Sequence, residues 1–558
     1  MADYDSLFES GKPTREDIIR LYDAGRKFKT AINLYETVKV NEDFYIGKQW
    51  EGVNAGGLPT PCVNILKRDV GFVVASVTSD NLSVQVVPME ATPGTRELDE
   101  NAGIINDELD RIFETLDVVG LVRRFARDAA VRGDSCIYLR WDPDAQNGQQ
   151  VSGDIKAEIL QNTRVFFGNP NSSEVESQPF IILESREIVR NCREEARENG
   201  SDEWDNIFPD DDNEAVGSER RTDDKVTKLL LLWREKDGYI WGCECTRTAL
   251  VRKPWNIGIR RYPITWMSWD EISDSYHGQA LITGLIPNQI AINKSYAMTI
   301  LSLMTTAYPK IIYDRTRVKK WDNRVGAAIP VNGGDLNGVA KIMDPAPVSP
   351  QIGEFTKLLT DQTNANLGAT SAALGDVRPN NTSAIIALQR AAQTPNEPTR
   401  RRMYQCVEDL TRIAMEYMAE YYGVRLTDVK TPPEIAEAYA FAGQEAPETI
   451  KQPFDYTVLH GMDLKVKVDV GASAYFSEIA TVQTLDNLLQ NGHINLVEYL
   501  ERLPAGYVPQ REKLIETRKQ AAENELTRGS GNVAGSELTP VTDSRNLSRD
   551  VTNGGKVV

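Results

Sequence analysis

The side chains that could carry out chemistry are few and widely spaced in this chain of 558 residues. Only three histidines are present, His277, His460 and His493, which leaves little for imidazole catalysis or metal binding. No cysteine pair has the spacing of a zinc site. The six cysteines are Cys62, Cys136, Cys192, Cys243, Cys245 and Cys406. Cys243 and Cys245 lie two residues apart in a predicted strand, so we expect both to be packing thiols on one face, in a reducing compartment.

The acidic triplet at residues 210–212 is the strongest candidate for a metal site, here magnesium. Adjacent side chains diverge, however, and seven acidic residues with no basic one lie between Ser201 and Ser218. Such a run is typical of a solvated loop, with docking of a basic partner as the weaker alternative. We therefore predict no metal and no cofactor.

Sequence motifs of the common enzyme classes are absent. There is no Gly-x-x-x-x-Gly-Lys-Ser/Thr phosphate loop, no Gly-x-Ser-x-Gly nucleophile elbow and no His-Glu-x-x-His zinc motif. Residues 52–60 are rich in glycine but lack the lysine that contacts phosphate. The sequence therefore predicts a protein that is not an enzyme.

The composition is that of a soluble protein with several structural units. Hydrophobic residues make up 41% of the chain, mean hydropathy is −0.40, and residues 1–10 do not resemble a secretion signal. The net charge of −18 argues against a protein that grips nucleic acid over its whole surface. An acidic surface beside DNA would instead repel the phosphates and prevent tight binding where DNA must slide.

One long segment is almost free of charge. Residues 275–309 carry a single formal charge, Lys294, and include Gln279, Asn288 and Pro287. A membrane span needs about 20 mostly apolar residues, and the uncharged run from 295 to 309 is shorter. We predict a helix that is covered by other copies of the chain, in a ring or bundle.

Basic residues follow this segment. Residues 308–325 hold six Lys or Arg against Asp314 and Asp322, between predicted strands at 311–313 and 327–331. Next come a predicted helix at 351–367, a turn-rich loop at 368–382, and a long helix at 383–422 that Pro395 and Pro398 should kink.

The rest of the chain mixes helices and strands, so the fold class is predicted as α+β, mainly helical. Helices are expected at residues 14–45, 95–132, 477–490, 495–503 and 509–522, and a disordered tail from 527. Strands are expected at residues 136–141, 155–159, 164–167, 180–184, 229–233, 239–244, 264–269, 455–459 and 464–470.

Short motifs accompany this order of elements. Tyr276-His277-Gly278 leads into Ile286-Pro-Asn-Gln-Ile-Ala-Ile-Asn293, and the segment 125–133 runs into a strand ending in Trp141-Asp142. Further motifs are Tyr45-Ile-Gly-Lys-Gln-Trp50, Val63-Asn64, Thr382-Ser383-Ala384 and Arg400-Arg401-Arg402. The chain resembles portal proteins of tailed bacteriophages over roughly residues 22–522. It departs from many of them at Asn169-Pro170, where they carry Asp-Pro, which puts in doubt any ion or turn role of that Asp.

The resemblance implies a dodecameric ring with a central channel, divided into wing, stem, clip and crown regions. The implied regions are the wing at 1–270, a first stem helix at 271–306, the clip at 307–350, a second stem helix at 351–367, the tunnel loop at 368–382, a long kinked helix with wing strands at 383–476, crown helices at 477–526 and a disordered tail at 527–558.

It also implies a function and partners. The ring would occupy one capsid vertex of the virion, assemble in the host bacterial cytoplasm, and conduct double-stranded DNA during packaging and ejection. Its partners would be the terminase large subunit, a head-tail adaptor, the major capsid and scaffolding proteins, and duplex DNA bound transiently and without sequence preference, with no membrane. The alternatives are another ring-forming or scaffolding assembly protein without a DNA channel and, third, an unidentified enzyme.

The resemblance and the charge pattern together suggest three groups of site residues. The DNA-channel group is Asp376, Arg378, Asn380, Asn381 and Lys294. The partner-binding group of the clip is Arg315, Arg317, Lys319, Lys320 and Arg324, which could alternatively neutralise acidic groups of neighbouring subunits. The subunit-interface group is Leu281, Ile282, Leu285, Ile290, Leu301 and Leu303.

Overall fold

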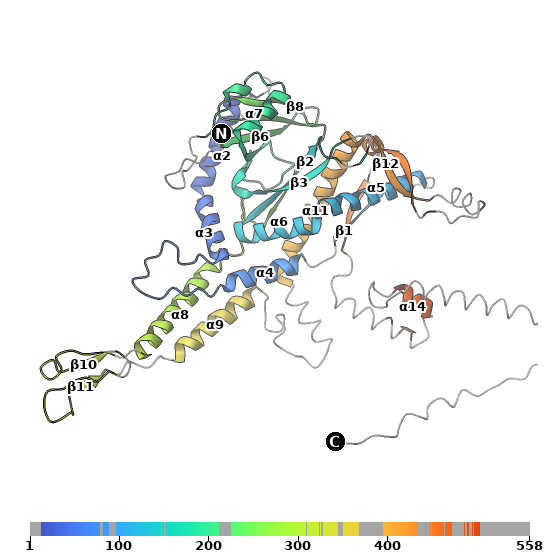
Figure 1. Ribbon diagram of the computed structural model, residues 1–558. Coiled ribbons are helices and arrows are strands. Elements are labelled where there is room, and N and C mark those ends of the chain that lie inside the picture. Colours follow the sequence, from blue (N-terminus) through green and yellow to red (C-terminus); the bar gives the residue numbers. More distant parts are fainter. Residues whose placement is uncertain are drawn as a thin grey trace, which may run out of the picture. The chain divides into compact units, whose positions relative to one another are not determined.

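The chain divides into two compact units, Met1–Gly471 and Ala472–Val558. The computed structural model describes residues 13–78, 82–88, 96–146, 148–149, 152–210, 225–307, 310–322, 324, 327–343, 350–367, 394–431, 441, 447, 449–462, 464–470, 485, 488–489, 494 and 496–502 (Figure 1). In the second unit the described helix is α14 (Leu496–Arg502), within the predicted helix 495–503. The predicted helix 509–522 and the tail lie outside the described residues, as does most of the predicted helix 477–490.

A small antiparallel sheet lies at the centre of the first unit. Its strand order is β3-β2-β9, formed by β3 (Asp154–Gln161), β2 (Asp134–Asp142) and β9 (Ile264–Ser268). Helices α6 (Val118–Arg132) and α11 (Glu397–Tyr417) pack against it. The three strands confirm the predicted ones at these positions.

A second antiparallel sheet is a five-stranded meander. The strands follow chain order and are β4 (Val165–Phe167), β5 (Phe180–Ile188), β6 (Lys225–Arg234), β7 (Ile240–Cys245) and β8 (Leu250–Asn256). Helix α2 (Arg15–Ala31) lays Ile18 and Tyr22 on one face, in a buried cluster that contains both Cys243 and Cys245. The two thiols therefore share a face as predicted, and burial raises the pKa of Cys243 to about 12.

Helix α7 (Val189–Glu198), which was not predicted, packs on β5, β6 and β8. Short 3₁₀ turns lie at Asn162–Arg164 and Trp204–Asn206.

The two long N-terminal helices predicted from the sequence are each broken in two. α2 ends at Ala31 and α3 (Leu34–Ile46) begins after Asn33, whose φ of 57° is left-handed. α5 (Arg96–Thr115) is likewise separated from α6 by Asp117, with φ 47°, whose carboxylate accepts the Gly120 amide N–H at 3.2 Å. Asn and Asp tolerate the left-handed region and cap helices through their side chains, which stops the helix although the apolar spacing continues.

Helix α4 (Ile65–Val77) and strand β1 (Leu82–Pro88) were not predicted. β1 pairs antiparallel with β14 (Leu464–Val470), a strand that confirms the predicted one, and α5 packs against β1. Val84, Val86 and Val466 are buried there. Residues nearly 400 positions apart in the sequence are thereby joined in one ribbon.

The C-terminal part of the first unit departs from the predicted long kinked helix. After a 3₁₀ turn (Thr394–Asn396), α11 begins at Glu397 and has Pro398 in its first turn, where proline is well tolerated. A π-helical turn, η4 (Met418–Tyr422), follows, and Gly423 ends it. Residues 383–393 lie outside the described residues.

Beyond η4 lies a hairpin of two strands that were not predicted, β12 (Val424–Lys430) and β13 (Thr449–Asp455). The predicted strand 455–459 is wrong: a 3₁₀ helix, η5 (Tyr456–Gly461), occupies this segment. The Asp455 carboxylate accepts the amide N–H of Thr457 at 3.0 Å and so starts the helix.

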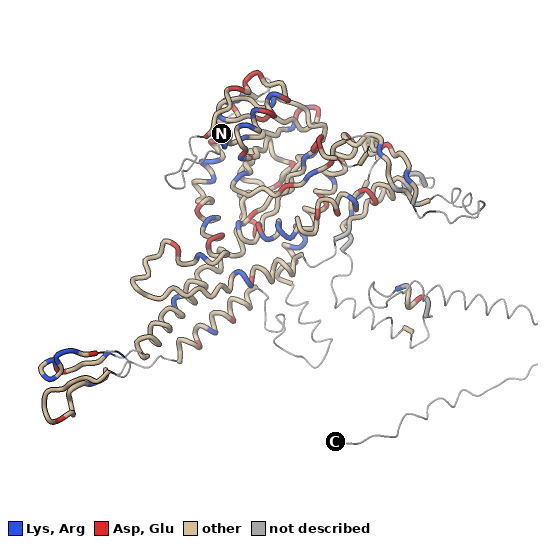
Figure 2. Tube along the Cα trace, viewed as in Figure 1, with Lys and Arg blue, Asp and Glu red and all other residues tan. Residues whose placement is uncertain are grey.

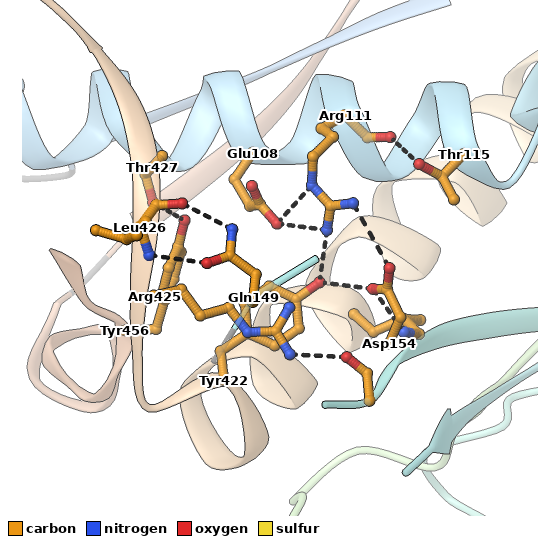
Figure 3. Close-up of polar contacts among 12 residues, drawn as sticks. Glu108, Arg111, Thr115, Gln149, Asp154, Tyr422, Arg425, Leu426, Thr427 and Tyr456 are labelled. Atoms are coloured by element: carbon orange, nitrogen blue, oxygen red, sulfur yellow. Dashed lines mark hydrogen bonds and ion pairs between the residues drawn. The ribbon is translucent and has the colours of Figure 1, made fainter. Parts of the chain in front are cut away.

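A polar network fastens this hairpin to the rest of the unit (Figure 3). Arg111 on α5 contacts Glu108 at 2.7 Å and Asp154 on β3 at 3.5 Å, and the Tyr422 hydroxyl donates to Asp154 at 3.1 Å. The Arg425 guanidinium lies 3.5 Å from the centre of the Tyr422 ring and donates to the Gly153 carbonyl at 2.8 Å. These contacts join α5, β3, η4 and β12.

A pair of helices with a hairpin between them completes the first unit. The helices are α8 (Ile286–Ala307) and α9 (Pro350–Asn366), which lie side by side, and the hairpin is formed by β10 (Ile311–Tyr313) and β11 (Ala340–Ile342) (Figure 1). Among the described helices none is long and apolar enough to cross a membrane.

Two predictions in this region need correction. The first stem helix was expected over 271–306, but residues 271–285 form an irregular segment with turns, and α8 begins at Ile286, with Pro287 in its first turn rather than mid-helix. The predicted strand 327–331 is not a strand, and β10 pairs instead with the later segment Ala340–Ile342.

Candidate functional site: the helix pair α8–α9 and its hairpin

The first turns of α8 are anchored by a chain of buried amide side chains, here called the amide relay and made of Gln49, Gln289 and Asn293. Asn293 Nδ2 donates to Gln49 Oε1 at 2.6 Å, and Gln289 Nε2 donates to Asn293 Oδ1 at 2.9 Å. Gln289 also bonds the main chain at the start of α4: its Nε2 donates to the Val63 carbonyl at 2.7 Å, and its Oε1 accepts the Ile65 amide N–H at 3.2 Å. The relay thus fixes α8 to the rest of the unit.

The remainder of α8 turns a nearly uncharged apolar surface outward. Lys294 is its one charged residue, and Figure 2 shows the helix almost without charge. Six large apolar side chains on it are at least 36% exposed: Ile290, Tyr296, Met298, Leu301, Leu303 and Met304. Large apolar side chains exposed together on one helix are typical of an interaction site.

Helix α9 extends this surface. Asn288 Nδ2 on α8 donates to Thr363 Oγ1 on α9 at 3.0 Å, and Arg68 on α4 donates to Asn364 Oδ1 at 2.8 Å. Phe355 and Leu358 are more than half exposed. The pair is therefore held at one end by polar contacts. Both helices expose large apolar side chains, which on α9 lie among the exposed charges Glu354, Lys357 and Asp361.

The hairpin region between the helices carries the basic residues. The Arg317 guanidinium donates to the Asp335 carbonyl, and Arg324 forms an ion pair with Asp322 at 2.6 Å. Arg315, Lys319 and Lys320 are exposed, and the described part of the hairpin contains no ion pair for any of them. Three of the five predicted clip residues are thus available to a partner, while Arg317 and Arg324 bind within the hairpin.

A match to known proteins decides the family. A family model described as phage P22-like portal protein matches residues 194–491, more than half of the chain. The chain belongs to the P22-like phage portal protein family. No protein among the curated sequences matches it.

Portal proteins are structural components of a phage rather than enzymes. The matched residues include the pair α8–α9, the hairpin and α11, and leave α2 to α6 outside. In the described part of the portal chain no three His, Cys, Asp or Glu side chains are grouped as a metal site. Asp210 instead bonds the Thr227 amide and hydroxyl, at 2.8 and 2.6 Å, and its neighbours 211–212 lie outside the described residues.

The predicted subunit-interface residues of the portal chain fall into two groups. Ile282 is fully buried and Leu285 is 7% exposed, both within the chain's own core, against which Leu281 also packs. These residues precede α8 or lie at its start, where they have little surface to offer a neighbour. Ile290, Leu301 and Leu303 lie on α8 and are exposed.

Of the five predicted DNA-channel residues, the structure describes one. Asp376, Arg378, Asn380 and Asn381 lie outside the described residues, and Lys294 is exposed on α8.

The Tyr276-His277-Gly278 motif is structural. His277 Nδ1 lies 2.8 Å from an Asp134 oxygen, and Asp134 also accepts the Gly278 amide at 2.7 Å. A side chain at Gly278 would collide with the Asp270 carbonyl, 2.4 Å away. The motif therefore locks the segment before α8 onto β2.

Sequence reasoning missed the amide relay and the long loop 47–64. The sequence singles out the motifs Tyr45-Ile-Gly-Lys-Gln-Trp50 and Gln289 to Asn293. It does not show that they contact each other, because Gln49 and Asn293 are 244 positions apart.

Proposed function

We propose that the protein forms the ring at one vertex of a phage capsid, through which double-stranded DNA is packaged and later ejected. The observation that carries this proposal is the anchored pair α8–α9, in which both helices expose large apolar side chains and α8 carries a single charge. Membership of the portal family supports a ring of identical subunits. Neighbouring copies would cover this surface and remove it from water.

In this proposal the ring is a dodecamer with wing, stem, clip and crown regions. The sheets with α2 to α7 form the wing, α8 and α9 the stem, and residues 307–350 the clip. The loop 368–382 faces DNA, α11 crosses the wing, and residues 477–526 form the crown. The subunit interface lies along Ile290, Leu301 and Leu303.

The clip docks the terminase large subunit during packaging and the head-tail adaptor afterwards. The exposed charges Arg315, Lys319 and Lys320 support this, because they form an uncompensated basic patch on a chain of net charge −18. The major capsid and scaffolding proteins surround the ring in the virion, and assembly takes place in the host cytoplasm.

Negative-stain electron microscopy of the purified full-length protein tests the proposal. We expect closed rings with a central hole wide enough for duplex DNA. Monomers or dimers at micromolar concentration would overturn it. An open lattice, or closed assemblies without a hole, would favour the alternative, a scaffolding or other assembly protein without a DNA channel.

A further inference from the structure

The loop between α3 and α4 is long and has no helix or strand of its own. α3 ends at Ile46 and α4 begins at Ile65, and residues 47–64 between them are called the arm. Irregular connections longer than about 12–15 residues are uncommon in compact domains and usually have a function. Lys48 and Glu51 are the arm's charged residues, and they pair with each other at 3.3 Å.

The base of the arm is held firmly. Trp50 Nε1 donates to the Pro61 carbonyl at 2.8 Å, which closes the loop on itself. Asn64 Nδ2 donates to the Tyr45 carbonyl at 2.9 Å, and Gln49 belongs to the amide relay. Because both ends are fixed by side-chain hydrogen bonds, the arm is presented in a defined position rather than as a loose tether.

The outer part of the arm is apolar and uncovered. Val53 is 56% exposed, Leu58 39% and Val63 41%. At Gly52, Gly56 and Gly57, which all have positive φ, an added Cβ would meet no described atom within 4 Å. A preordered loop thus exposes large apolar side chains that no other described part of the chain covers.

We propose that the arm packs against a second copy of this chain, on the apolar surface of that copy's α8–α9 pair. This rests on the ring assembly proposed above. Gln289 bonds the Val63 carbonyl, and the next residue, Ile290, is exposed, so the apolar surfaces of the arm and of α8 adjoin each other.

Ring symmetry and charge favour this occupant. A cyclic ring joins two different patches of the same chain, and rotation about the ring axis changes no residue's height along that axis. The arm, anchored beside the first turns of α8, therefore meets the neighbour at the height of its α8. The two charges of the arm pair with each other, and α8 carries Lys294 as its one charge, so contact between the arm and α8 would bury few unpaired charges.

Photo-crosslinking tests the inference. The full-length protein carries a benzophenone amino acid at position 53 or, separately, 58, and ¹⁵N-labelled and unlabelled chains are mixed before assembly. We expect crosslinks between labelled and unlabelled copies, mapped by mass spectrometry to residues 286–307 or 350–366. The same probe at Phe208, exposed on a loop of the wing, is the matched control and should not reach these helices.

A second measurement uses the double variant Val53→Ser, Leu58→Ser. Loss of interface side chains of this size should weaken association between copies about tenfold. The thermal midpoint of the dissociated chain should stay unchanged, because both side chains are exposed in it.

The outcomes separate the inference from the proposed function. Rings whose arm crosslinks only within its own chain, or to the capsid or scaffolding protein in procapsids, would overturn the inference and leave the ring intact. An unmodified protein that forms no rings would overturn both.

Discussion

At the residue scale, the amide relay explains why buried polar side chains occur in the first turns of α8. Gln289 and Asn293 are almost fully buried, and each amide finds a partner. A buried amide that loses its partner costs about 1–3 kcal/mol, because its bond to water is not replaced. The relay therefore stabilises only one placement of α8.

Replacing Asn293 with Leu should lower the free energy of unfolding by about 1–3 kcal/mol, since Gln49 and Gln289 lose partners together. Denaturant unfolding of the dissociated chain measures this. Ser295→Ala is the matched control, because among the described residues the Ser295 hydroxyl bonds the Ala291 carbonyl of its own helix and no other helix. Equal stability of the two variants would show that the relay contributes nothing to the fold.

The buried pair His277 and Asp134 makes stability depend on pH. Burial lowers the pKa of His277, an effect that the Asp134 hydrogen bond offsets only in part, and burial also lowers the pKa of the neighbouring Lys29. The unfolded chain therefore takes up protons that the folded chain does not, and stability falls as pH drops below the unfolded histidine value of about 6.5.

Unfolding midpoints measured from pH 7.5 to pH 5 should thus decrease, with a flatter slope in the variant His277→Gln. His460, half-exposed and 3.7 Å from Glu420, provides the control variant His460→Gln. If the unfolding midpoint of His277→Gln falls with pH as steeply as that of the unmodified chain, other groups cause the acid sensitivity.

At the element scale, apolar periodicity identified most helices and strands but not where they end. Asn33 and Asp117 interrupt two helices whose apolar spacing runs on, because a single left-handed residue changes direction without changing composition. β11 was missed because its three residues are exposed and pair with a short strand 27 to 31 positions earlier. Such pairing depends on the turn between the strands, which periodicity does not report.

The same limit applies to the site. The sequence marked residues 281–303 as apolar, yet it could not separate side chains that cover the chain's own core from those left for a neighbour. Leu285 belongs to the first kind and Leu301 to the second. A leucine loses the same apolar area to water whether it is buried in the chain's own core or between two copies. The two kinds of position therefore have the same amino-acid composition.

This distinction predicts different outcomes for two aspartate substitutions. Leu301→Asp should leave the subunit folded, because the side chain is 38% exposed, and should prevent ring closure by burying an unpaired charge between copies. Leu285→Asp should unfold the subunit, at a cost of several kcal/mol. Circular dichroism and size-exclusion chromatography measure the two effects, and normal rings of Leu301→Asp would refute the interface along α8.

The hairpin should act as a docking element. Reversing Arg315 and Lys319 to Glu should weaken binding of the terminase large subunit or the adaptor, since both charges are exposed, while rings still form. Arg324→Glu is the control in which an internal ion pair is lost instead. If rings of the charge-reversed variant bind these partners as well as unmodified rings do, the basic residues serve to neutralise acidic groups of neighbouring subunits instead.

At the scale of the whole molecule, the charge distribution suits DNA that passes without being held. The chain has a net charge of −18, and helices α8 and α9 carry four charged residues that balance, Lys294 and Lys357 against Glu354 and Asp361. An acidic ring repels the phosphate backbone over most of its surface. Contact is then confined to isolated cations, of which Arg378 is the one in the loop 368–382.

Isolated rings should therefore bind duplex DNA weakly, without sequence preference and with strong dependence on salt, because phosphate contacts carry no base information. Binding should fall steeply between roughly 50 and 200 mM salt, as counterion release requires. Arg378→Glu should weaken it further and shorten the DNA packaged in particles, while ring assembly stays normal. Arg401→Glu, an exposed change on α11 away from that loop in sequence, is the control. Tight DNA binding that persists at high salt would contradict a passive channel. ATP hydrolysis by the pure chain would contradict it too, because a ring that hydrolyses ATP would itself act as part of the packaging motor.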